Sequence, residues 1–190
     1  CDTPVAPTDQ YRHNMGCKQN IAEAKKLLKE AGYPNGIEMV IHVSTKEPTW
    51  PTIAEVIQQQ VAKAGIKVDI KMTPSKSYWK ETWMKKDVAM TRWNERSADS
   101  VLHEVYHSSA KWNESYYKSS DFDKNLADAR GELDFTKRKA LYEKAQHTLW
   151  NQSGTMIPYH VSKLVVTNSR VKNLDEVEVF SIQWHKVKVD

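Results

Sequence analysis

The chain has 190 residues, of which 39% are hydrophobic and 27% charged, and its formal net charge is +4. This balance excludes a disordered or fibrous protein, and no apolar run approaches the roughly 20 residues needed to cross a bilayer. Lysines are interspersed with glutamates and aspartates, as in KKLLKE, which is typical of solvated helix faces. We therefore expect no nucleic-acid partner.

The first half of the chain alternates helices with strands. Residues 1–17 carry two prolines and no periodicity, which indicates an extended, anchored segment. Apolar residues at helical spacing predict helices over 21–31 and 50–64, followed by Gly32 and Gly65 respectively. Strands are predicted over 37–43 and 66–72, then a short aromatic helix over 75–86 and a third strand over 88–93. This order predicts an α/β layer with right-handed crossovers.

The second half is mainly helical. Helices are predicted near 98–108, 121–131 and 134–152, with a polar, aromatic loop over 110–120. Two strand-like segments, 156–169 and 176–182, close the chain. The fold class is therefore α/β, with a sheet flanked by helices.

The two cysteines, Cys1 and Cys17, both lie in the irregular opening segment. A disulfide between them could pin a loop that has little core of its own, and it would indicate an oxidising compartment. Two unrelated thiols are the alternative reading.

The turn after the predicted strand 88–93 is the strongest candidate for a ligand site. Trp93 ends the strand and is followed by Asn94, Arg96 and Asp99. In open α/β layers, ligands bind outside the carboxyl ends of the strands. Trp93 offers a stacking surface, Arg96 suits a carboxylate and Asp99 an ammonium group, which together predict a zwitterionic ligand such as a peptide. Trp112, in the aromatic loop, is a further candidate.

The string HEVYH at 103–107 fits H-E-x-x-H, in which two histidines bind zinc and the glutamate acts as a base. A zinc metallopeptidase using His103, Glu104 and His107 is therefore an alternative function. The usual third-ligand position holds Asn113, and Glu114 follows His107 too closely to return on a second helix. A solvated or cleft-lining histidine pair is the simpler interpretation, and such a pair could make ligand binding depend on pH. We expect no cofactor, because the chain has neither a phosphate-binding glycine loop nor a G-x-S-x-G elbow.

The joint order of several motifs resembles a known family. QNIAEAKKLLKEAGYPNG before a strand, AEVIQQQVAKAGIKVDI, RWNERSAD, AKWNESYY and LDFTKRKALYEKAQ with MIPYH resemble the C-terminal part of the extracytoplasmic solute-binding proteins of ABC importers, in the peptide, dipeptide and nickel class (family 5). Members of this family fold as two α/β lobes that close over a ligand. The resemblance implies one lobe with a mixed sheet: residues 1–154 as the second ligand-binding lobe, and residues 155–190 as strands that return toward the hinge and first lobe.

The resemblance also implies a function and partners. It predicts a non-enzymatic protein, periplasmic or attached to the cell surface, that delivers a peptide or similar solute to the transmembrane subunits of an ABC permease. The N-terminal lobe of the same protein would complete the cleft. By the same match Trp93, Asn94, Arg96 and Asp99 line that cleft, although Glu95 replaces the family's usual glycine before the arginine and the spacing to Asp99 is short by one residue. Oligosaccharides, opines and metal chelates remain open as ligands, and an interaction module without a small ligand is a third possibility.

Overall fold

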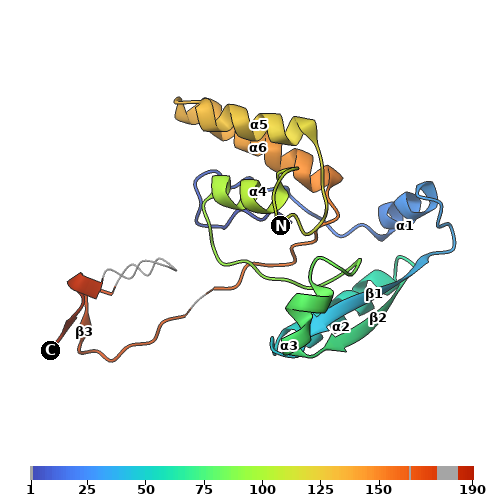
Figure 1. The fold of residues 1–190 in the computed structure, drawn as a ribbon, viewed down its shortest axis with the longest axis horizontal. Helices are drawn as coiled ribbons and strands as arrows, with labels where there is room; N and C mark the ends of the chain where they lie inside the picture. Colours follow the sequence, from blue (N-terminus) through green and yellow to red (C-terminus); the bar gives the residue numbers. More distant parts are fainter. Residues whose placement is uncertain (1, 163, 175–183) are drawn as a thin grey trace.

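The computed structural model describes residues 2–162, 164–174 and 184–190. Its elements are α1 (Ile21–Glu30), β1 (Ile37–Ser44), α2 (Trp50–Ala62), β2 (Ile66–Thr73), α3 (Ser75–Ser77), the π-helical turn η1 (Tyr78–Thr82), α4 (Ala98–Tyr106), α5 (Ser120–Gly131), α6 (Phe135–Gln152), β3 (Val171–Lys172), the 3₁₀ turn η2 (Trp184–Lys186) and β4 (Lys188–Val189). Figure 1 shows two layers, a helical layer of α4, α5 and α6 and a strand layer of β1 and β2 with α2.

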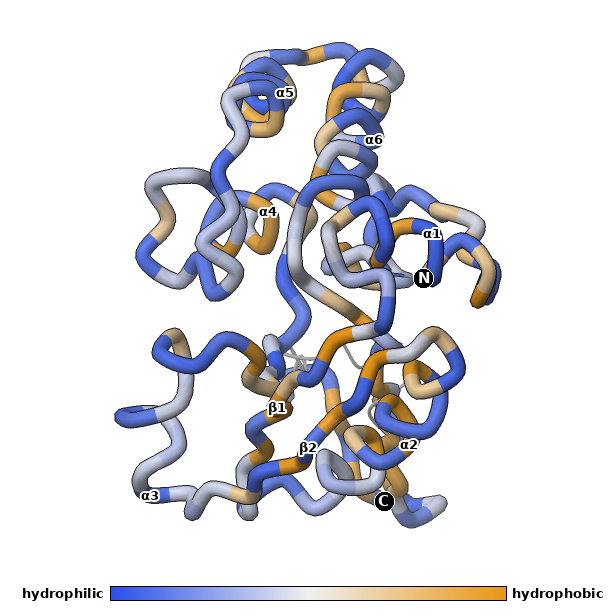
Figure 2. Tube along the Cα trace, turned by 90° about the vertical axis from the view of Figure 1, so that its right-hand side faces the viewer, coloured by the Kyte–Doolittle hydropathy of each residue, from blue (hydrophilic) through white to orange (hydrophobic). Residues whose placement is uncertain are grey.

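The strand layer is a βαβ unit. β1 and β2 pair in parallel, from Ile37 opposite Ile66 to Ser44 opposite Thr73, and α2 connects them. The apolar face of α2 packs on this sheet. The apolar side chains of the helix and those on one face of the strands are both removed from water in this way. The resulting core contains Ile41, Val43, Trp50, Ala54, Val68 and Tyr78. The side view in Figure 2 shows α2 beside β2 and the apolar strand residues in orange.

The two strands start from glycines in close contact. Gly36 and Gly65 both have a φ of +92°, and a Cβ atom added at Gly36 would lie 2.0 Å from the Gly65 carbonyl oxygen. The Ile37 N–H donates to that same oxygen at 3.2 Å. Only glycine allows both the positive φ and this approach.

The strand predicted over 88–93 is reduced to one parallel bridge between His42 and Ala89. His42 N–H donates to the Val88 carbonyl at 2.9 Å, and Met90 N–H donates to the His42 carbonyl at 3.0 Å. The buried Tyr78 hydroxyl lies within hydrogen-bond distance of both the Met90 and the His42 carbonyl oxygens, which share its one hydrogen, and so supports this bridge. Beyond the bridge, the side chains of Thr91 and Trp93 are hydrogen-bonded to Glu114.

The helical layer has its own core. Each of α4, α5 and α6 starts at a residue whose side chain caps the first turn, namely Ser97, Ser119 and Asp134. The helices bury one continuous cluster of Val5, Ala98, Val101, Leu102, Val105, Tyr106, Tyr117, Phe122, Leu126, Ala129, Tyr142, Ala145 and Leu149. The helices predicted near 98–108, 121–131 and 134–152 are thus confirmed within two residues at each end, whereas the helix predicted over 75–86 consists of the short α3 and η1 and ends at Thr82.

The opening segment is anchored to α6 by Gln146, which is 1% exposed. Its Oε1 accepts from the Thr3 hydroxyl at 2.9 Å and from the His13 N–H at 3.1 Å, and its Nε2 donates to the Tyr11 carbonyl at 2.8 Å. Burying an amide is favourable only when its donors and acceptors are used in this way. The extended, anchored segment predicted from the prolines is therefore confirmed, and Val5 is part of the core.

The closing segment leaves the body of the molecule (Figure 1). The described residues of the predicted strand 156–169 form no ladder, and Val161, Leu164 and Val166 are 77%, 89% and 94% exposed. A strand requires a partner for its backbone groups, and these residues have none in the described part of the chain. The predicted strand 176–182 lies outside the described residues. β3 and β4 form a short antiparallel pair, so parallel and antiparallel pairing occur in two separate sheets.

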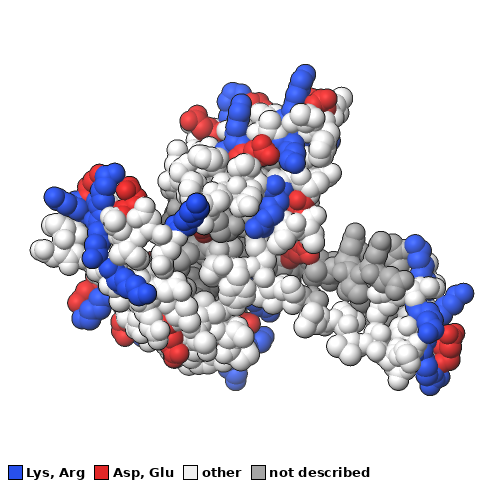
Figure 3. Space-filling view, turned by 180° about the vertical axis from the view of Figure 1, so that it is seen from behind, with Lys and Arg blue, Asp and Glu red and all other residues white. Residues whose placement is uncertain are grey.

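No helix in the described ranges is both long enough and apolar enough to span a membrane. Figure 3 shows basic and acidic side chains intermixed on one face of the molecule. The observed architecture confirms the predicted α/β class.

Candidate functional site

Trp93, Arg96 and Trp112 lie together where the two layers meet. The rings of Trp93 and Trp112 are 5.6 Å apart between centroids, and the Arg96 guanidinium carbon is 5.4 Å from the centre of the Trp93 ring. Trp93 is partly buried and Trp112 is 44% exposed. The three predicted residues therefore form one aromatic and cationic surface, with Trp112 as its more open ring.

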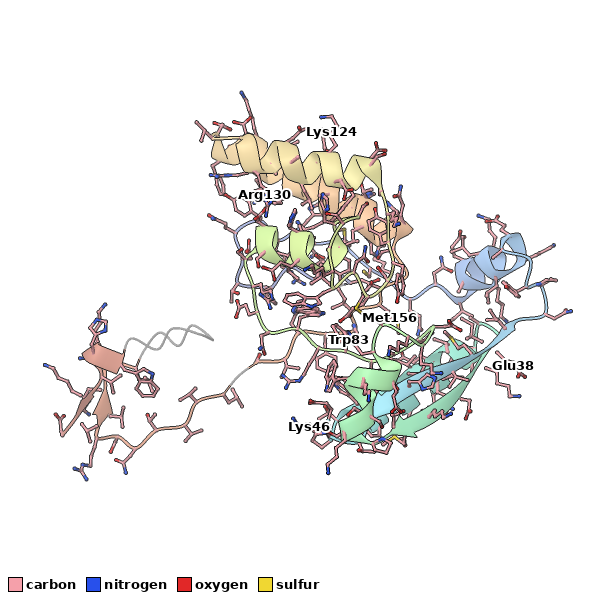
Figure 4. The ribbon with its side chains drawn as sticks, viewed as in Figure 1. Glu38, Lys46, Trp83, Lys124, Arg130 and Met156 are labelled. Carbon is pink, nitrogen blue, oxygen red and sulfur yellow. The ribbon has the colours of Figure 1, made fainter. Side chains whose placement is uncertain are left out.

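Glu114 connects this surface to the strand layer. Its Oε1 accepts from the Trp93 Nε1–H at 3.1 Å, from the Trp83 Nε1–H at 2.6 Å and from the Thr91 hydroxyl at 3.1 Å. Figure 4 labels Trp83 between the helical and strand layers. Burial raises the pKa of the Glu114 carboxyl, and the three hydrogen bonds partly oppose this shift.

The Arg96 side chain is held by Glu104, a residue of α4. Its Nη1 lies 2.9 Å from Glu104 Oε2, and the Ser100 hydroxyl donates to Glu104 Oε1 at 2.9 Å. The glutamate of the HEVYH string is thus an ion-pair partner of Arg96. A guanidinium fixed by a carboxylate and an aromatic ring is well suited to bind a planar anion such as a carboxylate.

Asp99, in the first turn of α4, is bound within the helical layer. Arg130 donates to it through Nε at 2.7 Å and through Nη2 at 2.8 Å, and the Tyr142 hydroxyl donates at 3.2 Å. Arg130, labelled in Figure 4, holds the pKa of the Asp99 carboxyl below its usual range. Asp99 therefore joins α4 to α5 and α6. The structure does not bring it into the cluster of Trp93 and Arg96, and Asn94 is exposed in the turn between them.

The histidine pair does not have the geometry of H-E-x-x-H on one helix. α4 ends at Tyr106, and His107 has an extended backbone with φ −58° and ψ 141°. The rings of His103 and His107 are 4.6 Å apart, and His107 Nε2 lies 3.7 Å from Asp123 Oδ1. Burial, then the charges of Arg130 and His107, lower the pKa of His103. Within the described ranges, no three His, Cys, Asp or Glu residues are grouped to hold a metal ion.

Cys17 is disulfide-bonded. Cys1 lies outside the described residues, so the predicted pairing of Cys1 with Cys17 stays a prediction.

Sequence reasoning missed the residues that position the site. By its position in the sequence Glu114 suggests only a zinc ligand, and the sequence does not predict the contacts of Thr91, Glu104 and Arg130. For Glu114 a signal existed: it is the single acid in the aromatic string KWNESYY. A buried acid among indoles and hydroxyls is expected to accept their hydrogens.

Comparison with known proteins identifies related sequences. The profile of the family described as "Bacterial extracellular solute-binding proteins, family 5 Middle" matches residues 2–113. The chain is 32% identical over 161 residues to the glutathione-binding protein GsiB of Escherichia coli K12, covering 78% of this chain and 31% of that protein. For the protein of the same name from Pectobacterium atrosepticum the identity is 29%, with the same coverage. The chain thus spans about a third of the length of these relatives.

Solved structures with the same fold are periplasmic binding proteins. The Helicobacter pylori protein DppA in complex with the peptide STSA is 32% identical with a TM-score of 0.67, covering 79% of this chain and 31% of that one. MoaA of Agrobacterium tumefaciens R10, in complex with mannopinic acid, is 26% identical with a TM-score of 0.67, covering 78% and 32%. NikZ of Campylobacter jejuni shares the fold at 20% identity, with a TM-score of 0.69, covering 80% and 34%. The chain therefore belongs to the bacterial extracellular solute-binding proteins of family 5.

Proposed function

We propose that this chain is one ligand-binding lobe of the substrate-binding component of an ABC importer, and that it captures a peptide or a similar small solute. The observation that carries the proposal is the grouping of Trp93, Trp112 and Arg96 on one surface. An open aromatic ring beside a fixed guanidinium matches the two parts of a peptide, an apolar or planar body and a carboxylate.

The relatives support this ligand class. One relative is named for glutathione, itself a small peptide with free carboxylates, and one solved structure holds the peptide STSA. The structure with mannopinic acid makes an opine the main competitor. Arg96 suits a carboxylate of any of these ligands.

The organisation proposed for the whole protein follows the family. Residues 1–154 would form the second lobe and residues 155–190 would return toward the hinge, so that an N-terminal lobe closes over the ligand. The protein would act without catalysis, in the periplasm or at the cell surface, and would deliver its ligand to the transmembrane subunits of a permease. Because closure between two lobes buries the ligand, one lobe alone should bind weakly.

Titration calorimetry on the full-length protein tests the proposal. Glutathione, the peptide STSA and mannopinic acid are the probes, and at least one should bind to the wild type. Trp93→Ala should weaken that binding at least about tenfold, which corresponds to the loss of roughly one stacking contact and its positioning. Trp150→Ala is the matched control, because Trp150 lies on α6 and contacts His147 rather than the site. No binding by any probe, or equal affinity in Trp93→Ala and wild type, would refute the proposal.

A further inference from the structure

The acidic side chain of Glu114 is hydrogen-bonded to two indoles, those of Trp83 and Trp93. Trp83 comes from the segment after η1, Trp93 from the turn after the bridge at Ala89, and Glu114 from the loop after α4. All three donors, the third being Thr91, converge on one oxygen, Glu114 Oε1, at 2.6 to 3.1 Å. These contacts join segments that are 21 to 31 residues apart in the sequence.

We infer that Glu114 is a positioning residue of the ligand site, which fixes the orientation of the Trp93 indole for contact with the ligand. The inference rests on the proposed function, because it assumes that a ligand uses the surface of Trp93, Trp112 and Arg96.

The geometry supports orientation rather than simple packing. An indole donates through a single N–H, so a fixed acceptor at 3.1 Å defines the direction of the Trp93 ring plane. The ring also contacts Trp112 and Arg96 and packs against the core of the helical layer. Glu114 accepts the indole N–H, so its loss would remove the constraint that this hydrogen bond places on the direction of the N–H.

Trp83 links the same carboxylate to a second row of rings. Trp83 and Trp79 are 5.7 Å apart, and Trp79 and Tyr78 are 5.5 Å apart. Tyr78 is fully buried and fixes the bridge between β1 and residues 88–90. Through these contacts Glu114 connects Trp93 to the core of the strand layer.

The charge of Glu114 also acts on two tyrosines. Burial, then the charge of Glu114, raises the pKa of the Tyr106 phenol, and Tyr78 is likewise raised by burial and by Glu114. Burial raises the pKa of the Glu114 carboxyl itself, and its three hydrogen bonds only partly oppose that shift. Titration of Glu114 should therefore be visible in its own two indole partners.

Two substitutions separate the roles of the acceptor atom and of the charge. Glu114→Ala removes the acceptor, and Glu114→Gln keeps an oxygen at the same position. In calorimetry on the full-length protein with glutathione and the peptide STSA, E114A should bind about tenfold more weakly, and E114Q should lie within about threefold of wild type. Asp128→Ala is the control: it removes an exposed carboxylate of α5 that pairs with Lys124, and should leave affinity nearly unchanged.

A double-mutant cycle with Trp93→Phe adds a readout that a merely structural role would not change. Trp93→Phe keeps an aromatic ring but removes the N–H donor. E114A, W93F and the double variant should bind with similar affinity, because each breaks the same hydrogen bond. Effects on the affinity that multiply in the double variant would overturn the inference.

The indole N–H resonances in an NMR spectrum test the positioning without any ligand. Those of Trp83 and Trp93 should move in E114A while that of Trp150 stays in place. If they do not move, the inference fails even when ligand binding is intact. If they move but E114A binds as tightly as wild type, Glu114 has a structural role only and the inference also fails. If they move but the wild type binds no probe, the proposed function is refuted, and the proposed role of Glu114 in binding is refuted as well.

Should E114A not fold, the pH dependence of the wild type decides the matter. The Trp83 and Trp93 resonances should shift together as Glu114 titrates, at a pH above the ordinary range of a glutamate carboxyl, and E114Q should abolish the shift. Flat profiles in the wild type would overturn the inference.

Discussion

Asp99 accepts two hydrogen bonds from the guanidinium of Arg130, at 2.7 Å from Nε and at 2.8 Å from Nη2. The residue that the sequence suggested for an ammonium group of the ligand is thus already paired between α4 and α5. Its first role in the described structure is to hold helices together.

Asp99→Asn should therefore lower stability at neutral pH by about 1 kcal/mol, the upper range for a partly exposed but bidentate pair. Because the folded-state pKa of Asp99 is depressed, this contribution is complete above about pH 4 and is lost as the pH falls toward the folded pKa. Denaturant unfolding at pH 7 and pH 3 measures the difference. Asp128→Asn, which breaks the exposed pair with Lys124, is the control and should cost less. Equal stability of D99N and wild type at pH 7 would contradict this reading.

Arg96→Gln should weaken the binding of a ligand with a free carboxylate more than the binding of a ligand without one. For a peptide with a free C-terminus we expect about tenfold weaker binding to the full-length protein, because a charge-assisted pair is lost. For the amidated peptide the loss should be below about twofold. Arg92→Gln serves as the control, since Arg92 pairs with Glu47 at 3.2 Å instead. A loss of affinity of equal size for both peptides would show that Arg96 does not bind the carboxylate.

Gly36→Ala should be the most destabilising single-carbon change in the strand layer. The new Cβ would lie 2.0 Å from the Gly65 carbonyl oxygen, and the φ of +92° is unfavourable for alanine, so we expect a loss of about 2–4 kcal/mol. Gly32→Ala is the matched control, because Gly32 has a φ of +91° but nothing within 4 Å of the added carbon. Its cost should be about 1 kcal/mol. Similar melting temperatures for the two variants would contradict the close approach of the glycines.

His42 should make folding less favourable in mild acid. It is 8% exposed, and burial, followed by the charges of Lys71 and Lys86, lowers its pKa. Between the lowered pKa and about 6.5 the unfolded chain binds more protons, so stability rises with pH in this window and is complete above it. Urea unfolding from about pH 5 to pH 7 should show a weaker pH dependence in His42→Leu than in wild type. The remaining dependence is expected from His103, whose pKa is also lowered, and with the opposite sign from Glu114, whose pKa is raised. Parallel curves for the two proteins would exclude this role of His42.

Local signals in the sequence were sufficient for most of the fold. Helical stripes with caps and the alternation in β1 and β2 predict elements that the structure confirms, because these patterns reflect which face is buried. The segments 88–93 and 156–169 were less predictable. Their strand-like composition shows that they suit an extended backbone, but a strand also needs a partner, which the local sequence does not reveal.

The grouping of the candidate residues could be predicted only in part for the same reason, and their role in binding stays a prediction. Trp93, Arg96 and Trp112 share one surface as expected, since the turn after the bridge and the aromatic loop meet between the layers. The partners of these residues come from distant segments: Glu114 is 21 residues from Trp93, and Arg130 is 31 residues from Asp99. Only tertiary structure shows whether a charged residue already has a partner, as Asp99 does, or remains available to a ligand.

A crystal structure of the full-length protein with a bound peptide would test the central claim most directly. The account predicts that the peptide lies between two lobes, within about 4 Å of the rings of Trp93 or Trp112, with its carboxylate hydrogen-bonded to Arg96. A peptide bound elsewhere, with no contact to residues 93–96 or to Trp112, would contradict it.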